Sequence, residues 1–596
     1  MPQPAAAQQT FTGRSSAPAS AGASRRELVR NLFSPGRRSL PSGYPLPVGM
    51  RRAGAASVAA KSASAALATA PLAVIALNRM GFGPRPGDIA AFNALGGNDT
   101  ARLTAYVDQQ LNPAAITDTE CNNKMTAAGY QTLNKTLTQL FQDHHVADPP
   151  DWEVRIQPAL ETELATWTRA VWSKRQLFES MVHFWHNHFS VYAYEFIEGP
   201  TFVHYDRDAI RANALGNFRT LLGAVARAPV MLMYLDNFIN FADDGLGYSN
   251  ENYARELIEL HTMGAEVSYG NTPRNQVPTD GNGVPLGYCE DDVKDMARSL
   301  TGWTFDIDWI GGNNTGVFVY RNDLHSTEAK TIVGTAIAAG GTASVDGNAA
   351  LDAIARHPAT GRFIAKKLCR RFIGDFPPAS LIDSAAALFT SQWQAGDQIR
   401  QVVRHILLSP EFKATWGEKV KRPFEIAVSA LRAVNADWRF YSQFPYPPDW
   451  NNWHADMQDT SSFHWLFEQG NQVIFGWHPP NGHPDIRGAW QATSPRVACW
   501  RLVNWLMDVQ NASGVWRLNA IAQTPAGVRS ANEIVDFWTD RILGRAMAAA
   551  DREQLVDFMA AGHNPDFDLP LSDEDTQDRL RSLLGLIFMT PDFLWR

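Results

Sequence analysis

Apolar side chains recur at three-, four- and seven-residue steps along most of this chain of 596 residues. In one stretch the apolar positions are Leu164, Trp167, Val171, Phe178 and Met181, with charged residues between them. That spacing places them on one face of an α-helix. The same period predicts helices over residues 210–226, 252–263, 292–300, 361–373, 424–433, 497–507, 532–548 and 578–589.

Three segments interrupt the helical pattern. Residues 267–287 are rich in Gly, Pro, Asn and Thr, and residues 438–484 hold many aromatic residues and prolines. Residues 310–347 mix β-branched residues with glycine pairs, which favours a small hairpin or sheet. We therefore predict a mainly α fold, in which residues 69–596 form one large helical domain with small irregular or β inserts. A toroid and a bundle of helical hairpins both fit this pattern.

The first 68 residues differ in composition from the rest, because they are rich in Ala, Ser, Pro, Gly and Arg and almost lack aromatic residues. Such a segment buries too little apolar surface to offset its ordering entropy, so we expect a disordered tail. Residues 24–29, Ser-Arg-Arg-Glu-Leu-Val, resemble a twin-arginine export motif. However, residues 35–52 separate the arginines from the weakly apolar stretch that follows a signal's arginines. We expect an exported protein, periplasmic or extracellular, with a cytoplasmic location as the alternative.

A short motif occurs twice, as Ile-Leu-Leu-Ser-Pro-Glu-Phe at 406–412 and as Ile-Phe-Met-Thr-Pro-Asp-Phe at 587–593. In each copy Ser or Thr can cap a new helix, and Pro takes the first helical position, where no N–H donor is needed. The acid that follows lies in the positively polarised first turn. We interpret the motif as a reused helix junction.

Charge and motif content exclude several classes of function. The net charge is −8, the isoelectric point is about 6.0, and no long basic stripe occurs, so nucleic acid is not an expected partner. No uninterrupted apolar run reaches the length of about 18 residues that a membrane span needs. The phosphate-binding loop, the dinucleotide fingerprint and the serine-hydrolase elbow are all missing from the sequence, so no cofactor is expected.

Three histidines lie close together in the segment MVHFWHNHFS, which covers residues 181–190. On a helix His183 and His186 share a face, whereas in an extended chain His186 and His188 share one. With a carboxylate from another segment they could bind a metal, but the metalloenzyme spacings are missing. The alternative is that His188 and its neighbour Asn187 form hydrogen bonds at a helix end.

A dense polar cluster covers residues 250–260. Glu251, Arg255 and Glu259 recur every four residues, so one helix face carries an acid, a base and an acid, with Glu256 beside them. A solvated ladder of ion pairs would have the same spacing. Asn250 and Asn252 bracket the helix start, where free backbone amides favour an anionic or hydroxyl-rich ligand.

A second polar pair, Asp236 and Asn240, precedes this helix. If Asp236 faces one of the glutamates across a cleft, the two carboxyl groups can act as the general acid and base of glycoside hydrolysis. The structural alternative is that Asp236 caps a helix or pairs with Arg255.

Isolated basic and aromatic residues are further candidates. Arg362 and Lys366 share a helical face and could neutralise the acidic helix. Trp303 and Trp477 are candidate stacking platforms for a sugar, although large aromatic residues also form cores.

Five motifs taken together resemble the bacterial domain-of-unknown-function family numbered eighteen hundred. They are ALNRMGFGP at 76–84, FWHNHF at 184–189, NENYARELIELHTMG at 250–264, EDDVKDMARSLTGW at 290–303 and KRPFE at 421–425. The resemblance implies a large, mainly helical bacterial protein that is commonly exported and often encoded beside a sulfatase-like partner. It implies no catalytic residues, and the insert at 267–287 departs from the compact family pattern.

These observations favour an exported hydrolase, a glycoside hydrolase that acts on a carbohydrate polymer. The candidate catalytic residues are Asp236, Glu251, Glu256 and Glu259. The candidate substrate-binding residues are Asn187, His188, Asn240, Asn250, Asn252, Arg255, Trp303 and Trp477. Two alternatives stay open: a metal-dependent enzyme that uses His183, His186 or His188, and a non-catalytic partner in export or assembly.

Overall fold

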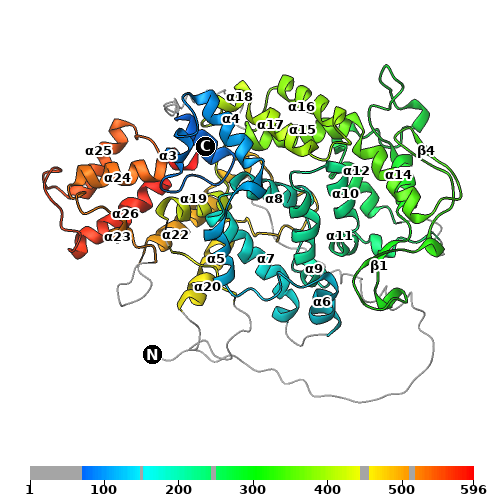
Figure 1. The fold of residues 1–596 in the computed structure, drawn as a ribbon, viewed down its shortest axis with the longest axis horizontal. Helices are drawn as coiled ribbons and strands as arrows, with labels where there is room; N and C mark the ends of the chain where they lie inside the picture. Colours follow the sequence, from blue (N-terminus) through cyan, green and yellow to red (C-terminus); the bar gives the residue numbers. More distant parts are fainter. Residues whose placement is uncertain (1–69, 148–151, 243–249, 436, 443–454, 509–516) are drawn as a thin grey trace, which may run out of the picture. The chain divides into compact units, whose positions relative to one another are not determined.

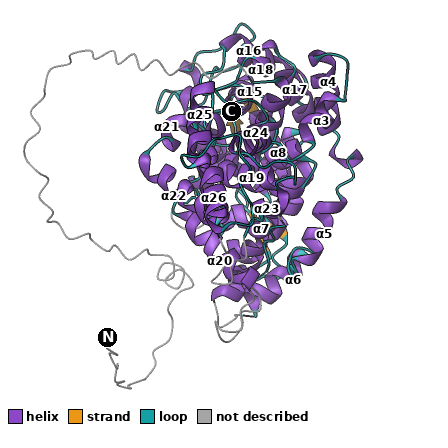
Figure 2. Cartoon of the chain, turned by 90° about the vertical axis from the view of Figure 1, so that its left-hand side faces the viewer, coloured by secondary structure: helices purple, strands orange, loops and turns teal. Residues whose placement is uncertain are grey.

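The computed structural model describes residues 70–147, 152–242, 250–435, 437–442, 455–508 and 517–596 (Figure 1). These residues belong to one compact unit. Most of them lie in helices, and strands are few and short (Figure 2). The prediction of a mainly α fold is therefore confirmed. The predicted tail at 1–68, with its export motif, lies outside the described residues.

The first of two large hydrophobic cores is built mainly from helices of the N-terminal and central parts of the chain. These helices are α2 (Leu72–Arg79), α3 (Asp88–Asn93), α4 (Asp99–Gln110), α8 (Gln176–His188), α9 (Glu198–His204), α10 (Phe218–Ala226), α11 (Pro229–Tyr234), α12 (Asn252–Glu259), α13 (Glu290–Ser299), α14 (Ala343–Ala355), α15 (Pro358–Phe372), α16 (Ala379–Ser391), α17 (Gln398–Leu407) and α18 (Pro410–Lys413). Within this set α15, α16 and α17 pack on one another.

The second large core is built from two helices of the N-terminal part and from most of the C-terminal helices. These helices are α5 (Thr119–Ala127), α7 (Trp152–Trp172), α19 (Pro423–Val434), α20 (Ala455–Glu468), α22 (Thr493–Met507), α23 (Ala520–Gln523), α24 (Ala531–Leu543), α25 (Ala549–Ala560), α26 (Glu574–Met589) and α27 (Pro591–Leu594). Two further short helices contribute to neither large core: α6 (Leu137–Phe141), whose Phe141 belongs to a small third cluster, and α21 (Arg487–Trp490). Phe475, in the loop 469–486 between α20 and α21, packs against both cores.

The predicted hairpin region forms two small antiparallel sheets. Strand β1 (Trp303–Phe305) pairs with β2 (Phe318–Tyr320), and β3 (Lys330–Ile332) pairs with β4 (Thr335–Ile337). The insert at 267–287 is irregular apart from short 3₁₀ turns, as predicted. The insert at 438–484 is only partly irregular: residues 443–454 are not described, and α20 occupies part of the rest. In α20 Phe463 and Phe467 pack against Trp167, which anchors a helix that sequence periodicity missed.

Several predicted helices are shorter in the structure than in the sequence pattern: the stretch from Leu164 to Met181 is divided between α7 and α8, and the helix predicted over 252–263 ends at Glu259. The segment 210–226 is not one helix, because the side chain of Asn217 accepts a hydrogen bond from the backbone N–H of Thr220 and starts α10 anew. The helix predicted over 532–548 ends at Leu543, where Gly544 adopts a left-handed conformation with φ of 67°.

The reused helix junction is present in both copies. Ser409 accepts a hydrogen bond from the N–H of Phe412 at the start of α18, and Thr590 accepts one from the N–H of Phe593 at the start of α27. In each case proline occupies the first helical position, where its missing N–H leaves no unpaired donor. The structure therefore confirms the capping interpretation.

None of the described helices combines the length and the apolar character that crossing a membrane requires. Helix α7 has 21 residues, which is the length of a span. It nevertheless buries the charged residues Arg155, Glu161 and Glu163 inside the protein.

Candidate functional site

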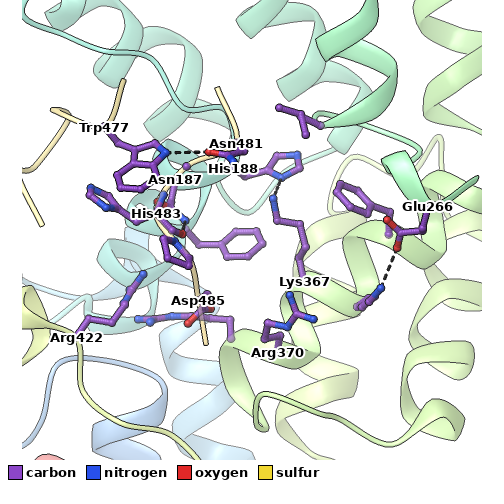
Figure 3. Close-up of a pocket in the computed structure, with 17 residues that line it drawn as sticks. Asn187, His188, Glu266, Lys367, Arg370, Arg422, Trp477, Asn481, His483 and Asp485 are labelled. Atoms are coloured by element: carbon purple, nitrogen blue, oxygen red, sulfur yellow. Dashed lines mark hydrogen bonds and ion pairs between the residues drawn. The ribbon is translucent and has the colours of Figure 1, made fainter. Parts of the chain in front are cut away.

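A pocket of about 410 Å³ is lined by elements from both large cores. The end of α8, the middle of α15, the residue before α19 and the loop 469–486 contribute its walls (Figure 3). We call it the basic pocket after its five cationic lining residues, which are Lys366, Lys367, Arg370, Arg371 and Arg422.

Asn187 ties the end of α8 to the loop 469–486. Its side-chain amide donates to the carbonyl oxygen of His483 at 2.9 Å and accepts from the N–H of His483 at 2.8 Å. The contact requires a glycine at 482, because a Cβ there would lie 2.0 Å from the carbonyl oxygen of Asn187, and its φ is +71°. Asn187, a predicted substrate-binding residue, thus lines the pocket, but both ends of its amide hold the loop.

His188 and Lys367 form the best-defined contact inside the basic pocket. The Nε2 atom of His188 lies 3.0 Å from the carbonyl oxygen of His261, and its Nδ1 atom lies 2.8 Å from Nζ of Lys367. A carbonyl oxygen only accepts, so Nε2 carries the proton and Nδ1 accepts from Lys367. Burial, with the charge of Lys367 second, holds the pKa of His188 well below its usual range, so the ring is neutral.

Two of the lining residues, Arg371 and Arg422, belong to a buried ion network centred on Glu425. Arg371 and Arg422 both bind Oε1 of this carboxylate, Arg422 at 3.0 Å, and Arg596 binds it at 2.9 Å. The side chains of all four residues are at most 4% exposed. The surrounding guanidinium groups outweigh burial and hold the pKa of Glu425 well below its usual range. The carboxyl group is therefore ionised, and one negative charge faces three positive ones.

A second ion network anchors the end of the loop. Lys419 binds both Asp375, at 3.1 Å, and Asp485, at 3.0 Å. The other oxygen of Asp375 accepts the backbone N–H of Arg487 at 2.8 Å, at the start of α21. Asp485 lines the pocket, and its negative charge is balanced by Lys419.

Positive charge exceeds negative charge in the pocket. The lining has five cationic residues and two acidic ones, Glu266 and Asp485. Glu266 pairs with Lys366 at 2.9 Å, and Asp485 pairs with Lys419. Within the described part of the chain, no carboxylate oxygen lies within 4.0 Å of the charged nitrogens of Lys367 or Arg370. The pocket thus has the charge of an anion site.

The three histidines of the segment 181–190 point to different partners. His183 stacks on Phe424 with ring centroids 4.9 Å apart, and Nε2 of His186 lies 2.9 Å from Asp206, whereas His188 binds Lys367. Among the described residues no group of three or more His, Cys, Asp or Glu side chains is placed to hold a metal ion. The geometry therefore gives no support to a shared metal site at these histidines.

The acidic helix α12 carries the predicted ladder of ion pairs. Arg255 binds Glu251 at 3.2 Å, Glu259 at 3.6 Å and Glu290 of α13 at 2.8 Å. We call these four residues the Arg255 ladder. Arg362 and Lys366 do not neutralise it, contrary to the prediction, because Arg362 pairs with Asp383 and Lys366 with Glu266.

The structure brings several predicted polar residues together at the start of α12. Asn252 donates to a carboxylate oxygen of Asp236 at 3.2 Å, and Asn250 donates to the carbonyl oxygen of Asp236 at 3.1 Å. The N–H of Asn250 in turn binds the side-chain oxygen of Asn240 at 2.9 Å. Asp236 has a φ of 61°, an uncommon conformation for a residue with a Cβ.

Asp236, Glu198 and Glu256 all have raised pKa values, and Asp236 lies close enough to Glu198 to contribute to the shift of that residue. Burial raises the pKa of Asp236 and, with the charge of Glu259, that of Glu256. Burial also raises the pKa of Glu198 to about 7, with added contributions from Glu195 and Asp236. Burial and the charges of Glu256 and Glu198 also raise the pKa of the Tyr234 hydroxyl group. We call Glu198, Tyr234, Asp236 and Glu256 the acid cluster.

Two predicted substrate-binding residues are enclosed in the interior. Trp303 is 0% exposed, donates from its indole N–H to the carbonyl oxygen of Ala343 at 2.7 Å, and packs over Gly347. Asn240 is also 0% exposed and donates to the carbonyl oxygen of Ala297. Both are structural, contrary to the prediction, because β2 and α14 enclose Trp303 and α13 binds Asn240 in the interior. Trp477, by contrast, lines the basic pocket.

Sequence reasoning found Lys366 of α15 but missed its pocket cations Lys367, Arg370 and Arg371, and it missed the buried acid Glu198. A signal for the cations was present, because residues 366–371 read Lys-Lys-Leu-Cys-Arg-Arg. Positions 367, 370 and 371 lie three and four residues apart, so they share a helix face. No sequence signal marks Glu198, whose raised pKa follows from tertiary burial.

The comparisons with known proteins agree with the motifs. A family model described as "Protein of unknown function (DUF1800)" matches residues 75–595, nearly all of the described chain. No curated protein and no solved structure gives a match. The chain therefore belongs to the DUF1800 family of proteins of unknown function.

Proposed function

We propose that this protein is a hydrolase for a substrate with an anionic group, most simply an acidic carbohydrate polymer. The observation that carries the proposal is the unbalanced charge of the basic pocket, in which Lys367 and Arg370 have no carboxylate partner among the described residues. Unpaired cations in a partly desolvated pocket favour a carboxylate, sulfate or phosphate group.

The rim of the pocket supports a sugar as the body of the substrate. Trp477 offers an aromatic face, and its indole N–H donates to the side chain of Asn481 at 2.9 Å, which fixes the ring (Figure 3). Aromatic faces stack on the apolar faces of sugar rings. An anionic sugar would therefore place its charge against α15 and its ring against Trp477.

The acid cluster borders the same loop and supplies candidate acid and base groups. Tyr234 of the cluster donates its hydroxyl proton to the backbone of His478, next to Trp477. Leu260, directly after α12, lines the basic pocket, so α12 connects the two sites. Carboxyl groups with raised pKa values suit general acid catalysis near neutral pH. We assign this role to Asp236 and Glu256, since Glu251 and Glu259 are bound to Arg255.

Binding tests the anion site first. Calorimetric titration of the full chain with an oligomer of uronic acid should give heat of binding, whereas a neutral glucose oligomer of equal length should give none. Lys367→Met should weaken binding about tenfold, which is about 1.4 kcal/mol. The matched control is Lys294→Met, because Lys294 is an exposed residue of α13 outside the pocket. Equal binding of the charged and neutral oligomers would contradict the proposal.

Turnover tests the hydrolase. Release of reducing ends from the uronic acid oligomer should fall at least about 100-fold in Asp236→Asn and in Glu256→Gln, since a general acid or base contributes about that much. Glu290→Gln is the matched control, because it removes a carboxylate of the Arg255 ladder outside the acid cluster. Binding without turnover would instead favour the non-catalytic alternative. Export and a sulfatase-like partner stay predictions.

A further inference from the structure

Lys367 is an amine in a setting unlike that of the surface lysines. Its Nζ atom donates to Nδ1 of His188 at 2.8 Å and lies 5.3 Å from the centre of the Phe363 ring. No Asp or Glu oxygen of the described chain lies within 4.0 Å of it. By contrast, its sequence neighbour Lys366 pairs with Glu266.

The charges around Lys367 come from several elements. Asp485 of the loop and Glu266, which follows α12, favour the ammonium form, whereas Arg370 on the next turn of α15 opposes it. His188 of α8 is neutral. Burial is the largest effect and lowers the pKa of Lys367 to about 8. A large share of the side chain is therefore neutral amine at slightly alkaline pH.

The hydrogen bond to His188 fixes what the neutral amine can do. A neutral amine has two N–H bonds and one lone pair. One N–H is directed to Nδ1 of His188, which is an acceptor because Nε2 donates to the carbonyl oxygen of His261. The lone pair and the second N–H are left for a ligand in the pocket.

Unused donors next to Lys367 can hold an anionic group. The Nε atoms of Arg370, Arg371 and Arg422 are buried and have no hydrogen-bond partner among the described residues. The residues Arg371 and Arg422 are 1% and 4% exposed. Buried donors without a partner are unfavourable unless a ligand or water satisfies them. All three residues line the basic pocket with Lys367.

We propose that Lys367 is a nucleophile that forms an imine with a carbonyl compound bearing a carboxylate or similar anionic group. The Nζ–C bond forms as the carbonyl π bond opens, the carbonyl oxygen gains a proton, and the nitrogen loses one, for which Nδ1 of His188 is the adjacent acceptor. The nitrogen then gives up its second proton, which leaves with the hydroxyl group as water, and the C=N double bond of the imine forms in its place. The reaction needs no oxidant or reductant, and its substrate class includes 2-oxo acids and open-chain acidic sugars.

This inference rests on the anion site of the proposed function but not on hydrolysis. The two can fail separately: uronate binding without imine formation would refute only the nucleophile, whereas imine formation without oligomer cleavage would refute only the hydrolase.

Reductive trapping tests the nucleophile directly. The full chain is incubated with glyoxylate and cyanoborohydride at pH 8, and the modified lysines are located by peptide mass spectrometry. We expect Lys367 to be labelled at least about tenfold more than Lys294 within the same sample, a ratio equal to about 1.4 kcal/mol. Inorganic phosphate should protect Lys367 and leave Lys294 unchanged.

Two comparisons make the result decisive. Acetaldehyde, which has no charge, should lower the ratio of Lys367 to Lys294 labelling, because it cannot use the guanidinium groups. Lys367→Arg should abolish the dominant adduct, whereas Lys294→Arg should preserve it, with circular dichroism verifying that both variants fold. Labelling spread evenly over exposed lysines, or an equal ratio for acetaldehyde and glyoxylate, would overturn the proposal.

Discussion

The wall of the basic pocket and the acidic helix are inverse arrangements of the same charges. At the pocket one carboxylate, Glu425, binds three guanidinium groups whose side chains are at most 4% exposed. On the helix one guanidinium group, that of Arg255, binds three carboxylates, and the four side chains are 24–33% exposed. Water and salt screen the helix charges, whereas burial keeps the pocket charges strong. The acidic helix has the denser run of charges in the sequence, but each charge of the Glu425 network should contribute more to the free energy of unfolding because it is buried.

The largest expected effect of a single change is at Glu425. Glu425→Gln removes the only carboxylate that the structure gives to Arg371 among the described residues, and it leaves three buried cations facing one another. Loss of one partner of a buried ion network costs about 3–5 kcal/mol. The free energy of unfolding, measured with denaturant, should fall by this amount. A loss below about 1 kcal/mol would mean that water reaches the network and that the two regions do not differ as described.

The second effect concerns the acid cluster and depends on pH. Burial raises the pKa of Glu198 to about 7 from the usual 4.5. Between these values the folded protein keeps a proton that the unfolded chain has released, so this group stabilises the fold below pH 4.5 and loses that contribution as pH rises through 7. Glu198→Gln mimics the protonated acid. At pH 8 it should therefore be more stable than the wild type by about 3 kcal/mol, since one pKa unit equals about 1.4 kcal/mol.

The matched control is Glu195→Gln, which removes a neighbouring carboxylate whose charge adds to the raised pKa of Glu198. It should shift the transition of the wild type to lower pH without abolishing it. A pH profile of unfolding that is identical in the wild type and Glu198→Gln would show that Glu198 is solvated.

Sequence patterns predicted the parts of this molecule that depend on local geometry. The helix junctions at Ser409 and Thr590 were predictable because capping needs only residues next to each other in the chain. The Arg255 ladder was predictable for the same reason, except for Glu290, which comes from another helix. The Asn187 contact with the loop and the enclosure of Trp303 depend on segments distant in sequence, which no spacing rule relates.

The basic pocket was the harder part to predict. Its cations come from α15 and from the residue before α19, and their meaning depends on which of them lack a carboxylate partner. A run such as Lys-Lys-Leu-Cys-Arg-Arg is usually a solvated helix face. Only tertiary contacts distinguish Lys366, which has Glu266, from Lys367, which has a neutral histidine.

A third effect is expected in the pH dependence of the basic pocket. Burial lowers the pKa of Lys367 to about 8 from 10.5, so anion affinity of the pocket should decrease as pH rises through 8. Stability of the free protein should change in the opposite sense, because between pH 8 and 10.5 the unfolded chain binds a proton that the folded chain does not. Phosphate titrations and unfolding curves of the wild type and Lys367→Met measure both trends. Identical trends in the variant would assign them to other groups.

The smallest expected effect is at the Arg255 ladder. It tests whether the number of ion pairs or their burial decides how much a charged cluster stabilises the fold. Arg255→Gln removes the single cation shared by Glu251, Glu259 and Glu290. It therefore breaks three ion pairs, as Glu425→Gln does. Because the side chains are 24–33% exposed, each pair contributes only about 0.2–1 kcal/mol. The total loss should stay near 1 kcal/mol and should shrink further in high salt, whereas the loss in Glu425→Gln should not. A loss comparable with that of Glu425→Gln and insensitive to salt would mean that α12 holds its charges away from water, and the acidic helix would then join the acid cluster as a desolvated site.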